Sequence, residues 1–256
     1  MIADPRTVHG PRDTARFQKL GFEDLRALAC DPTLSEAEKM GFARGHREGF
    51  DDAIWASMLG LLPRLSGPVA RVLDIGCGCG EIARKLIAQA EASGHQLTLI
   101  DHQEMLDLLP MSKAVTAVAG RFPDDMSPSE GGFDVIIAYS VLPVVVIDAN
   151  PFAFVDAALE RLNPGGRLLI GDVPNFSKLR RFLSSSAGAD YHRAYMRTDE
   201  APRVPPFAPA TDRIDDGLLL GLMLRARLAG FDAYLLPQSP ELAFANRRED
   251  LLIERP

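Results

Sequence analysis

The sequence has 256 residues, of which 46% are hydrophobic and 25% charged, a balance that fits a globular α/β domain with appended segments or two small domains. The 28 basic and 35 acidic residues leave a net charge of −7, which argues against a general nucleic-acid binder because such proteins carry a basic surplus. No apolar run approaches the roughly 18–20 residues of a membrane helix, and the start lacks the pattern of a secretory signal. The three cysteines, with two of them one residue apart, favour a cytoplasmic location.

Residues 1–66 form the first predicted unit, which is mainly helical. Ser35–Glu38 has the pattern of a capping box, in which a hydroxyl and a carboxylate satisfy free amides at a helix start. Apolar residues between 42 and 62 are spaced as on the inner face of a helix, and Ser66-Gly67-Pro68 ends the unit. We expect this extension to cover the substrate site, and a role in forming a homodimer is the alternative.

Residues 67–256 form the second predicted unit, in which short apolar runs alternate with amphipathic segments. This alternation is typical of a parallel sheet with helices on both faces. The expected strands cover 70–75, 96–101, 114–119, 133–139, 167–173, 231–236 and 250–255, and the expected helices cover 81–92, a short stretch ending at 106, 152–162 and 215–229.

The segment 174–213 interrupts this rhythm, because it is far longer than the roughly 2–6 residues of most connections. It carries seven basic and four acidic side chains, a local charge of +3 in a protein of −7. We interpret it as a cationic lid insertion that faces an anionic substrate. An ordinary solvated surface loop is the alternative.

The most informative segment is a turn with glycines at 76, 78 and 80, between a strand and a helix. Glycines let the backbone approach a ligand closely, and the helix start offers unpaired amides. A dinucleotide fingerprint would read G-x-G-x-x-G, but here the third glycine comes one residue early. Asp74 and Glu81 would repel a pyrophosphate and suit a cationic amine. Asp101, at the end of the second strand, suits two ribose hydroxyls.

With these residues the chain resembles the class I S-adenosylmethionine-dependent methyltransferases of the small-molecule type. Residues 72–80 are similar to their first motif, 99–101 to the acidic end of their second strand, 133–140 to their fourth-strand motif and 162–170 to the turn before their fifth strand. The resemblance implies a Rossmann-like α/β fold with a seven-stranded sheet of order 3-2-1-4-5-7-6, strand 7 antiparallel, and helices on both faces. It also implies S-adenosylmethionine as the cofactor, bound over the carboxyl ends of strands 1 and 2.

The resemblance also assigns roles to individual residues. The methionine portion would contact Asp74 and the turn, the ribose would contact Asp101, and the adenine would lie near His102 and Gln103. Arg121 stands where many members carry an acidic residue for the adenine amine, so that contact passes to the backbone or to a nearby side chain. The full set of expected cofactor-binding residues is Asp74, Gly76, Cys77, Gly78, Gly80, Asp101, His102, Gln103, Arg121, Phe122 and Tyr139.

Several substrate classes lack their signature residues. The fourth strand is not followed by the Asn/Asp-Pro-Pro-aromatic motif of base-amino methyltransferases, nor by a Pro-Cys nucleophile. Metal-dependent catechol-type enzymes need carboxylates after strands 4 and 5, and only Asp172 is present, so no metal is predicted. These features favour methyl transfer to a hydroxyl, or in second place an amine, of a small anionic metabolite such as a sugar or polysaccharide precursor.

The expected catalytic residues come from the lid and the N-terminal extension. His192 is the first candidate for a general base, because a histidine near neutral pH can take a proton from a hydroxyl, although an ordinary loop histidine is the alternative. His46 is the next candidate and Tyr191 a further one. The residues expected to bind the substrate are Arg180, Arg181, Arg193 and Tyr195.

Three alternatives stay open on the sequence. The same fold could act on a protein or an RNA, with the cationic lid as the contact surface. A cofactor-binding protein that has lost its chemistry is the second alternative. A nicotinamide-dependent oxidoreductase is the third, because it would also use a glycine-rich turn.

Overall fold

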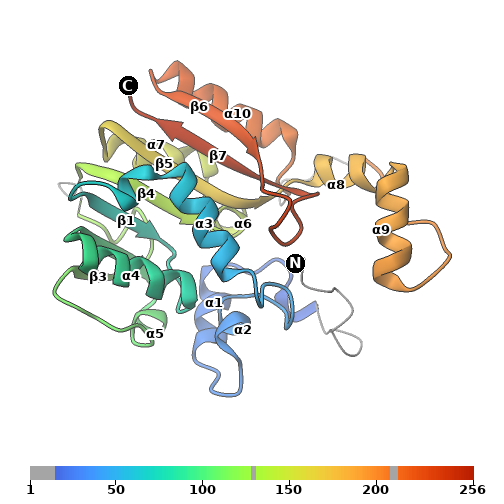
Figure 1. Cartoon of the computed structure of the whole chain (residues 1–256), viewed down its shortest axis with the longest axis horizontal. Coiled ribbons are helices and arrows are strands. Elements are labelled where there is room, and N and C mark those ends of the chain that lie inside the picture. The colour runs from blue at the N-terminus through green and yellow to red at the C-terminus, as the bar shows by residue number, and fades with distance from the viewer. Residues whose placement is uncertain (1–14, 128–130, 208–212) are drawn as a thin grey trace.

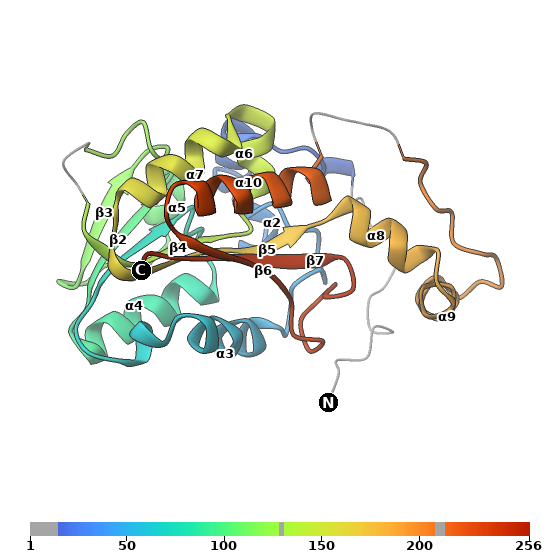
Figure 2. The same cartoon turned by 90° about the horizontal axis from the view of Figure 1, so that it is seen from above.

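A computed structural model of the chain describes residues 15–127, 131–207 and 213–256. The chain forms three layers, with a central sheet between two layers of helices (Figures 1 and 2). Helices α3 and α4 cover one face, and α6, α7 and α10 cover the other. Among the described residues, no helix combines the length and apolar character needed to cross a membrane.

The sheet has seven strands in the order β3-β2-β1-β4-β5-β7-β6. β1 to β5 run parallel, and β7 is antiparallel to both of its neighbours. The expected Rossmann-like order is therefore confirmed. The strands are β1 (Arg71–Ile75), β2 (Gln96–Asp101), β3 (Val115–Ala119), β4 (Phe133–Tyr139), β5 (Leu162–Pro174), β6 (Asp232–Pro237) and β7 (Arg248–Glu254).

The core lies on both faces of the sheet because successive strand side chains point to opposite faces. Val72 packs in the cluster under α3 and α4, and its neighbour Leu73 packs in the cluster under α7 and α10; both are fully buried. The core-forming helices are α3 (Asp51–Leu61), α4 (Glu81–Ser93), α6 (Leu142–Asp148), α7 (Pro151–Glu160) and α10 (Asp216–Leu228). The short α5 (Gln103–Leu106) follows β2.

The N-terminal extension divides between the core and the carboxyl ends of the strands. α3 contributes the buried Ile54 and Met58 to the cluster that it shares with α4, so part of the extension belongs to the core. α1 (Phe22–Ala29) and α2 (Glu36–Lys39) contact the start of α5 and the glycine turn, and two 3₁₀ turns cover Ala15–Phe17 and Pro63–Ser66. Residues 1–14 of the predicted extension lie outside the described residues.

The segment expected as a lid loop contains two helices, α8 (Phe176–Leu183) and α9 (Ser186–Met196). The Asn175 side chain caps α8, and the Ser185 hydroxyl caps α9, which satisfies the free amides of each helix start. Both helices project beyond the end of β5 (Figures 1 and 2). In this structure the two helices form an arm, and the role of the segment as a lid over the substrate stays a prediction; residues 208–212 of the segment lie outside the described residues.

Candidate active site

A cavity opens at the carboxyl ends of β1, β2 and β4, where parallel α/β sheets bind ligands. Its empty volume is about 1100 Å³ with the open mouth included. One wall comes from the extension and the rest from the sheet and the helices after it. The lining includes Phe22, Met40, Phe42, Arg47, Asp74, Gly76, Cys77, Gly78, Gly80, Asp101, His102, Arg121, Phe122, Tyr139, Ser140 and Val141.

The glycine turn connects β1 to α4 and borders this cavity. Gly76 and Gly78 have φ angles of +66° and +63°, a left-handed conformation that side chains disfavour. A Cβ atom on Gly78 would also lie 2.6 Å from the Sδ atom of Met40. The turn therefore favours glycine for its conformation, and a side chain at Gly78 would also displace the flexible Met40 side chain at the end of α2.

Asp101 connects the turn to the second strand. Its carboxylate accepts hydrogen bonds from the backbone N–H groups of Gly78 and His102, both at 2.7 Å. Because a carboxylate has about four acceptor positions, Asp101 keeps capacity for a ligand hydroxyl. The carboxylate is held rigidly in the cavity wall, as expected for a group that binds ribose.

His102 lies beside Asp101 at the same end of the cavity. Its Nδ1 atom is 3.0 Å from Asp101 Oδ1, and its ring stacks on Phe22 of α1 with centroids 3.7 Å apart. The Nε2 atom is buried and has no hydrogen-bond partner among the described residues. Buried polar atoms are rarely left without a partner, so this nitrogen indicates a polar ligand at this end.

Asp74 and Arg47 bring a carboxyl group and a guanidinium into the same cavity. Asp74 is buried, and desolvation together with the nearby Asp101 raises its pKa to about 8, an effect that Arg47 reduces. The Arg47 guanidinium lies 4.9 Å from the Phe42 ring centroid and 5.1 Å from that of Tyr139. A ligand with an ammonium and a carboxylate group would find a partner for each.

These features together fit an aminoacyl nucleoside. The acidic and basic pair suits the amino-acid end, Asp101 suits the sugar, and the buried nitrogen of His102 beside Phe22 suits the base. Arg121 lines the base end with its guanidinium 5.7 Å from the Phe22 ring centroid, so no carboxylate occupies that position. The residues present therefore fit S-adenosylmethionine.

A smaller recess adjoins the cavity and shares Phe42, Arg47 and Tyr139 with it. Its empty volume is about 280 Å³ with the open mouth included. The recess lies at the carboxyl ends of β4 and β5 and is closed by the loop between β6 and β7. The other residues that line it are His46, Ile54, Asp172, Leu242, Ala243, Phe244 and Arg248.

The predicted cofactor residues mostly meet in the cavity, where all but one of the set line the wall. Gln103 is the exception, because its amide donates to Asp107 at 2.6 Å and it does not line the cavity. Among the predicted catalytic residues, His46 lines the recess, whereas His192 and Tyr191 lie on α9 and line neither space. His192 as the general base stays a prediction that no contact in the structure supports.

The predicted substrate-binding residues lie on the arm, and their cationic groups have local partners. Arg181 pairs with Asp216, Arg193 pairs with Asp190, and Arg180 donates to the Pro205 carbonyl at 2.8 Å. Tyr195 stacks on Tyr191 with centroids 5.6 Å apart. None of the four lines the cavity or the recess.

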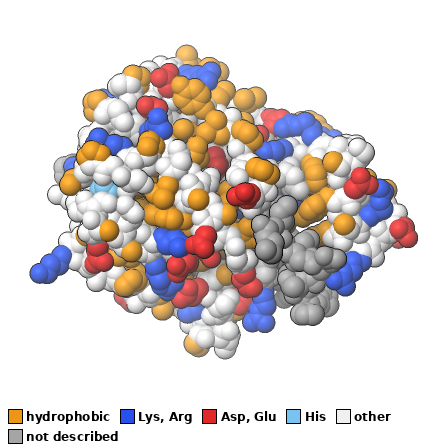
Figure 3. Space-filling model, viewed as in Figure 1, with side chains coloured by type: hydrophobic (Ala, Val, Ile, Leu, Met, Phe, Trp, Pro, Cys, Tyr) orange, Lys and Arg blue, Asp and Glu red, His pale blue; other side chains and the backbone are white. Residues whose placement is uncertain are grey.

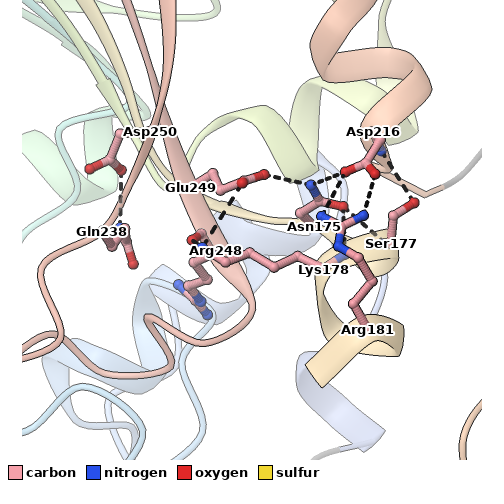
Figure 4. A network of polar contacts seen from close by, with 9 residues as sticks. All are labelled: Asn175, Ser177, Lys178, Arg181, Asp216, Gln238, Arg248, Glu249 and Asp250. Atoms are coloured by element: carbon pink, nitrogen blue, oxygen red, sulfur yellow. Dashed lines mark hydrogen bonds and ion pairs between the residues drawn. The ribbon is translucent and has the colours of Figure 1, made fainter. Parts of the chain in front are cut away.

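The base of the arm is held in place by a polar network (Figure 4). The buried Asn175 amide donates to Asp216 at 2.7 Å and to Glu249 at 2.5 Å, and Lys178 donates to the Arg248 carbonyl at 2.7 Å. The network joins α8 to β7 and α10. It explains why the segment leaves the sheet in a fixed direction and why its first cations are not available to a substrate.

Several site residues were missed by the sequence analysis. Phe22, Met40, Phe42 and Arg47 belong to the extension. Phe244 lies in the loop between β6 and β7, and Arg248 is the first residue of β7. No local motif marks them, since they reach the site only through the tertiary fold. The one signal in the sequence was the expected position of the extension over the substrate site.

The order of the sheet and the glycine turn with its two aspartates define a class I methyltransferase. A family model for a methyltransferase domain matches residues 47–201, which is more than half of the chain. The chain belongs to this family of S-adenosylmethionine-dependent methyltransferases, and S-adenosylmethionine is the cofactor.

Curated relatives match about half of the chain. A ubiquinone biosynthesis O-methyltransferase of Xylella fastidiosa is 29% identical over 140 residues, which cover 50% of this chain and 51% of the relative. A ribosomal protein L11 methyltransferase of Wolinella succinogenes is 31% identical over 153 residues, which cover 59% of this chain and 48% of the relative. The chain therefore spans about half the length of the curated relatives it matches.

Solved structures show the same fold over nearly the whole chain. The plantazolicin methyltransferase BpumL, in complex with a triazolic desmethylPZN analog and SAH, has a TM-score of 0.56 at 15% identity and covers 91% of this chain and 99% of its own. The N-methyltransferase NodS from Bradyrhizobium japonicum WM9, in complex with SAH, has a TM-score of 0.54 at 13% identity and covers 92% and 98%.

Proposed function

We propose that the chain transfers the methyl group of S-adenosylmethionine to a hydroxyl of a small, anionic acceptor. The observation that carries this proposal is the presence of Asp74, Arg47 and Asp101 in one cavity. These groups match the ammonium, carboxylate and ribose of the cofactor. The adjoining recess, which shares Arg47 and Tyr139 with the cavity, is where the acceptor would bind.

In this mechanism the protein aligns the reactants and accepts a proton. The cofactor, when bound, supplies an electrophilic methyl group on sulfur. Asp74 and Arg47 bind the two charged groups of its amino-acid end, and Tyr139 lines both the cavity and the recess. Much of the rate enhancement would come from this alignment. His46 lines the recess and would take the acceptor proton, a role that the position of His192 on the arm does not support.

The charge of the recess favours a hydroxyl acceptor over an amine. Arg47 and Arg248 bring two positive charges against the one negative charge of Asp172, so a protonated amine would be repelled. The printed names of the similar proteins include both an O-methyltransferase and an N-methyltransferase. The choice of oxygen therefore rests on the electrostatics of this recess.

A protein or RNA acceptor remains the second candidate, because one of the matched relatives is a ribosomal protein methyltransferase. The face shown in Figure 3 carries acidic and basic side chains side by side. Such mixed charge gives no continuous basic surface on that face for a phosphate backbone. This favours the small-molecule proposal.

The test follows a radiolabelled methyl group from S-adenosylmethionine into an extract divided into small-molecule and macromolecule fractions. We expect label in an acidic small-molecule fraction, as a product stable to conditions that cleave methyl esters. The Asp101→Asn variant should label far less at a limiting cofactor concentration, and Glu91→Gln, an exposed acid on α4, should label as the wild type does. Label confined to protein or RNA would contradict the proposal.

A further inference from the structure

The recess beside the cofactor cavity has unusual backbone geometry. Five non-glycine residues in the described part of the chain have positive φ angles; two of them line this recess, and a third is hydrogen-bonded to one of those two. Asp172 (φ 58°) and Phe244 (φ 60°) line it, and Ser140 (φ 64°) donates to Asp172 at 2.5 Å. Such conformations are unfavourable for residues other than glycine and concentrate at functional sites. Their clustering indicates a ligand-binding site.

Asp172 anchors one guanidinium in the recess. Its carboxylate accepts from Ser140 and from Nη1 of Arg248, and its backbone N–H donates to Asp250 at 2.8 Å. The other N–H groups of Arg248 have no hydrogen-bond partner among the described residues. In Figure 4 the Arg248 side chain extends away from the Asn175 network. Arg248 is therefore pre-positioned, with donors that remain available to a ligand.

Phe244 closes the recess from the side of the loop between β6 and β7. Its ring centroid lies 4.4 Å from that of His46, and the Arg247 guanidinium lies 4.2 Å from the ring centroid. The Phe244 ring therefore packs between the His46 imidazole and the Arg247 guanidinium, and the Phe244 backbone has a left-handed conformation. Its size determines how far a ligand can extend past His46.

We propose that this recess is the acceptor subsite, that Arg248 binds a carboxylate or phosphate group of the acceptor, and that Phe244 limits the acceptor's size. The inference rests on the proposed function and adds the groups that select the substrate. A guanidinium held in place by a carboxylate suits an oxyanion with two acceptor atoms. A neutral or cationic molecule of the same size gains nothing from it.

The experiment uses the full chain saturated with SAH and four hexose-sized probes: glucuronate, glucose 6-phosphate, glucose and glucosamine. The imidazole signals of His46, assigned with His46→Gln, report binding at the recess itself. We expect glucuronate or glucose 6-phosphate to shift these signals with at least about tenfold higher affinity than glucose or glucosamine. The two anions distinguish a carboxylate from a phosphate acceptor.

Four variants, two at each position, test Arg248 and Phe244 separately. Arg248→Met should remove the preference for the anions, and Arg248→Lys should restore part of it. Because Arg248→Met leaves Asp172 without its partner, Phe244→Trp provides a second test that keeps the charges: it should fill the recess and abolish the shifts. Phe244→Ala should admit the methyl glycoside of the preferred anion more strongly than the wild type does.

The affinity for SAH separates this inference from the proposed function. It should be unchanged in all four variants, since neither residue lines the cofactor cavity. Equal response of His46 to all probes, no response to any of them, or full response in Phe244→Trp would overturn the inference. Failure of the wild type to bind SAH would instead contradict the proposed function.

Discussion

The carboxylate of Asp101 accepts a hydrogen bond from the backbone N–H of Gly78 at 2.7 Å. This bond connects the turn after β1 to the end of β2 in the wall of the cofactor cavity. The bond depends on the left-handed conformation of Gly78 (φ 63°), which directs its amide toward the second strand. One interaction thus sets both the path of the glycine turn and the position of the carboxylate expected to bind ribose.

Replacing Gly78 by alanine should therefore disrupt both the path of the glycine turn and the position of the Asp101 carboxylate. The left-handed conformation costs an L-residue about 1–2 kcal/mol, and the new Cβ would lie 2.6 Å from Met40 Sδ. We expect lower thermal stability and loss of measurable S-adenosylmethionine binding by calorimetry. The matched control is Gly60→Ala on α3, where a Cβ meets nothing within 4 Å; it should stabilise the helix by up to about 1 kcal/mol and bind normally. Normal binding by Gly78→Ala would show that the turn tolerates a side chain.

Asp101→Asn should weaken cofactor binding about 10- to 100-fold, since hydrogen bonds to a charged group contribute roughly 1.5–3 kcal/mol. An amide has one acceptor oxygen, and the backbone N–H groups of Gly78 and His102 already compete for it. Titration with SAH measures the loss. Methylthioadenosine, which keeps the ribose but lacks the amino-acid end, should lose affinity by the same factor. Unequal losses would place Asp101 elsewhere than at the sugar.

Cofactor binding should release a proton because of Asp74. Burial and Asp101 raise its pKa to about 8, so the free protein carries a neutral Asp74 below that pH. The ammonium of the cofactor favours the ionised carboxylate, and affinity should therefore rise between pH 6 and 7.5, by up to about tenfold per unit. Calorimetry in buffers of different ionisation enthalpy counts the proton. Asp74→Asn should bind more weakly and release none, and a pH-independent wild type would contradict the assignment.

The same shift affects the stability of the free protein. A carboxyl whose folded pKa is raised above its ordinary value of 3.8 holds a proton that the unfolded chain has released. Its contribution to the free energy of unfolding is therefore lost as pH rises from about 4 to 8. Asp74→Asn should be more stable than the wild type at pH 8, with a smaller gain at pH 5. Chemical denaturation at the two pH values checks this, and an equal change at both would contradict it.

Asn175 and Asn150 offer a comparison between two helix caps. Each accepts from two backbone N–H groups at the start of its helix, but Asn175 is 1% exposed and also donates to Asp216 and Glu249. Asn150→Ala should lower the free energy of unfolding by about 1 kcal/mol. Asn175→Ala should cost more, by about 1–3 kcal/mol, because it also removes the two hydrogen bonds that this buried amide donates. Equal losses would mean that the network does not stabilise the base of the arm.

Much of the fold and of the cofactor site could be predicted because the signals are local. Alternating apolar runs identify strands, and the turn at 76–80 with Asp74 and Asp101 lies within about 30 residues of sequence. The two helices of the arm were not predicted, although Asn175 and Ser185 are ordinary N-cap residues. The prolines and charged residues of this segment are more typical of a loop. The pairing of Arg193 with Asp190, three residues earlier, was also readable from the sequence.

The residues that line the recess could not be predicted from the sequence for a different reason. His46, Asp172 and Arg248 lie far apart in the chain and meet only once β5, β7 and the extension have packed together. Phe22 reaches His102 through α1 in the same way. Composition indicated an anionic substrate from the net charge of the arm, but it contained no information on which arginines already had carboxylate partners.

The most direct test of the account is a calorimetric titration of the purified chain with S-adenosylmethionine, SAH and NAD. We expect saturable 1:1 binding of the first two, weakened in Asp101→Asn and Arg47→Met and unchanged in Lys113→Met, an exposed cation away from the cavity. NAD should give no heat of binding. Saturation by NAD without a response to the sulfonium compound would contradict the assignment of the glycine turn and everything derived from it.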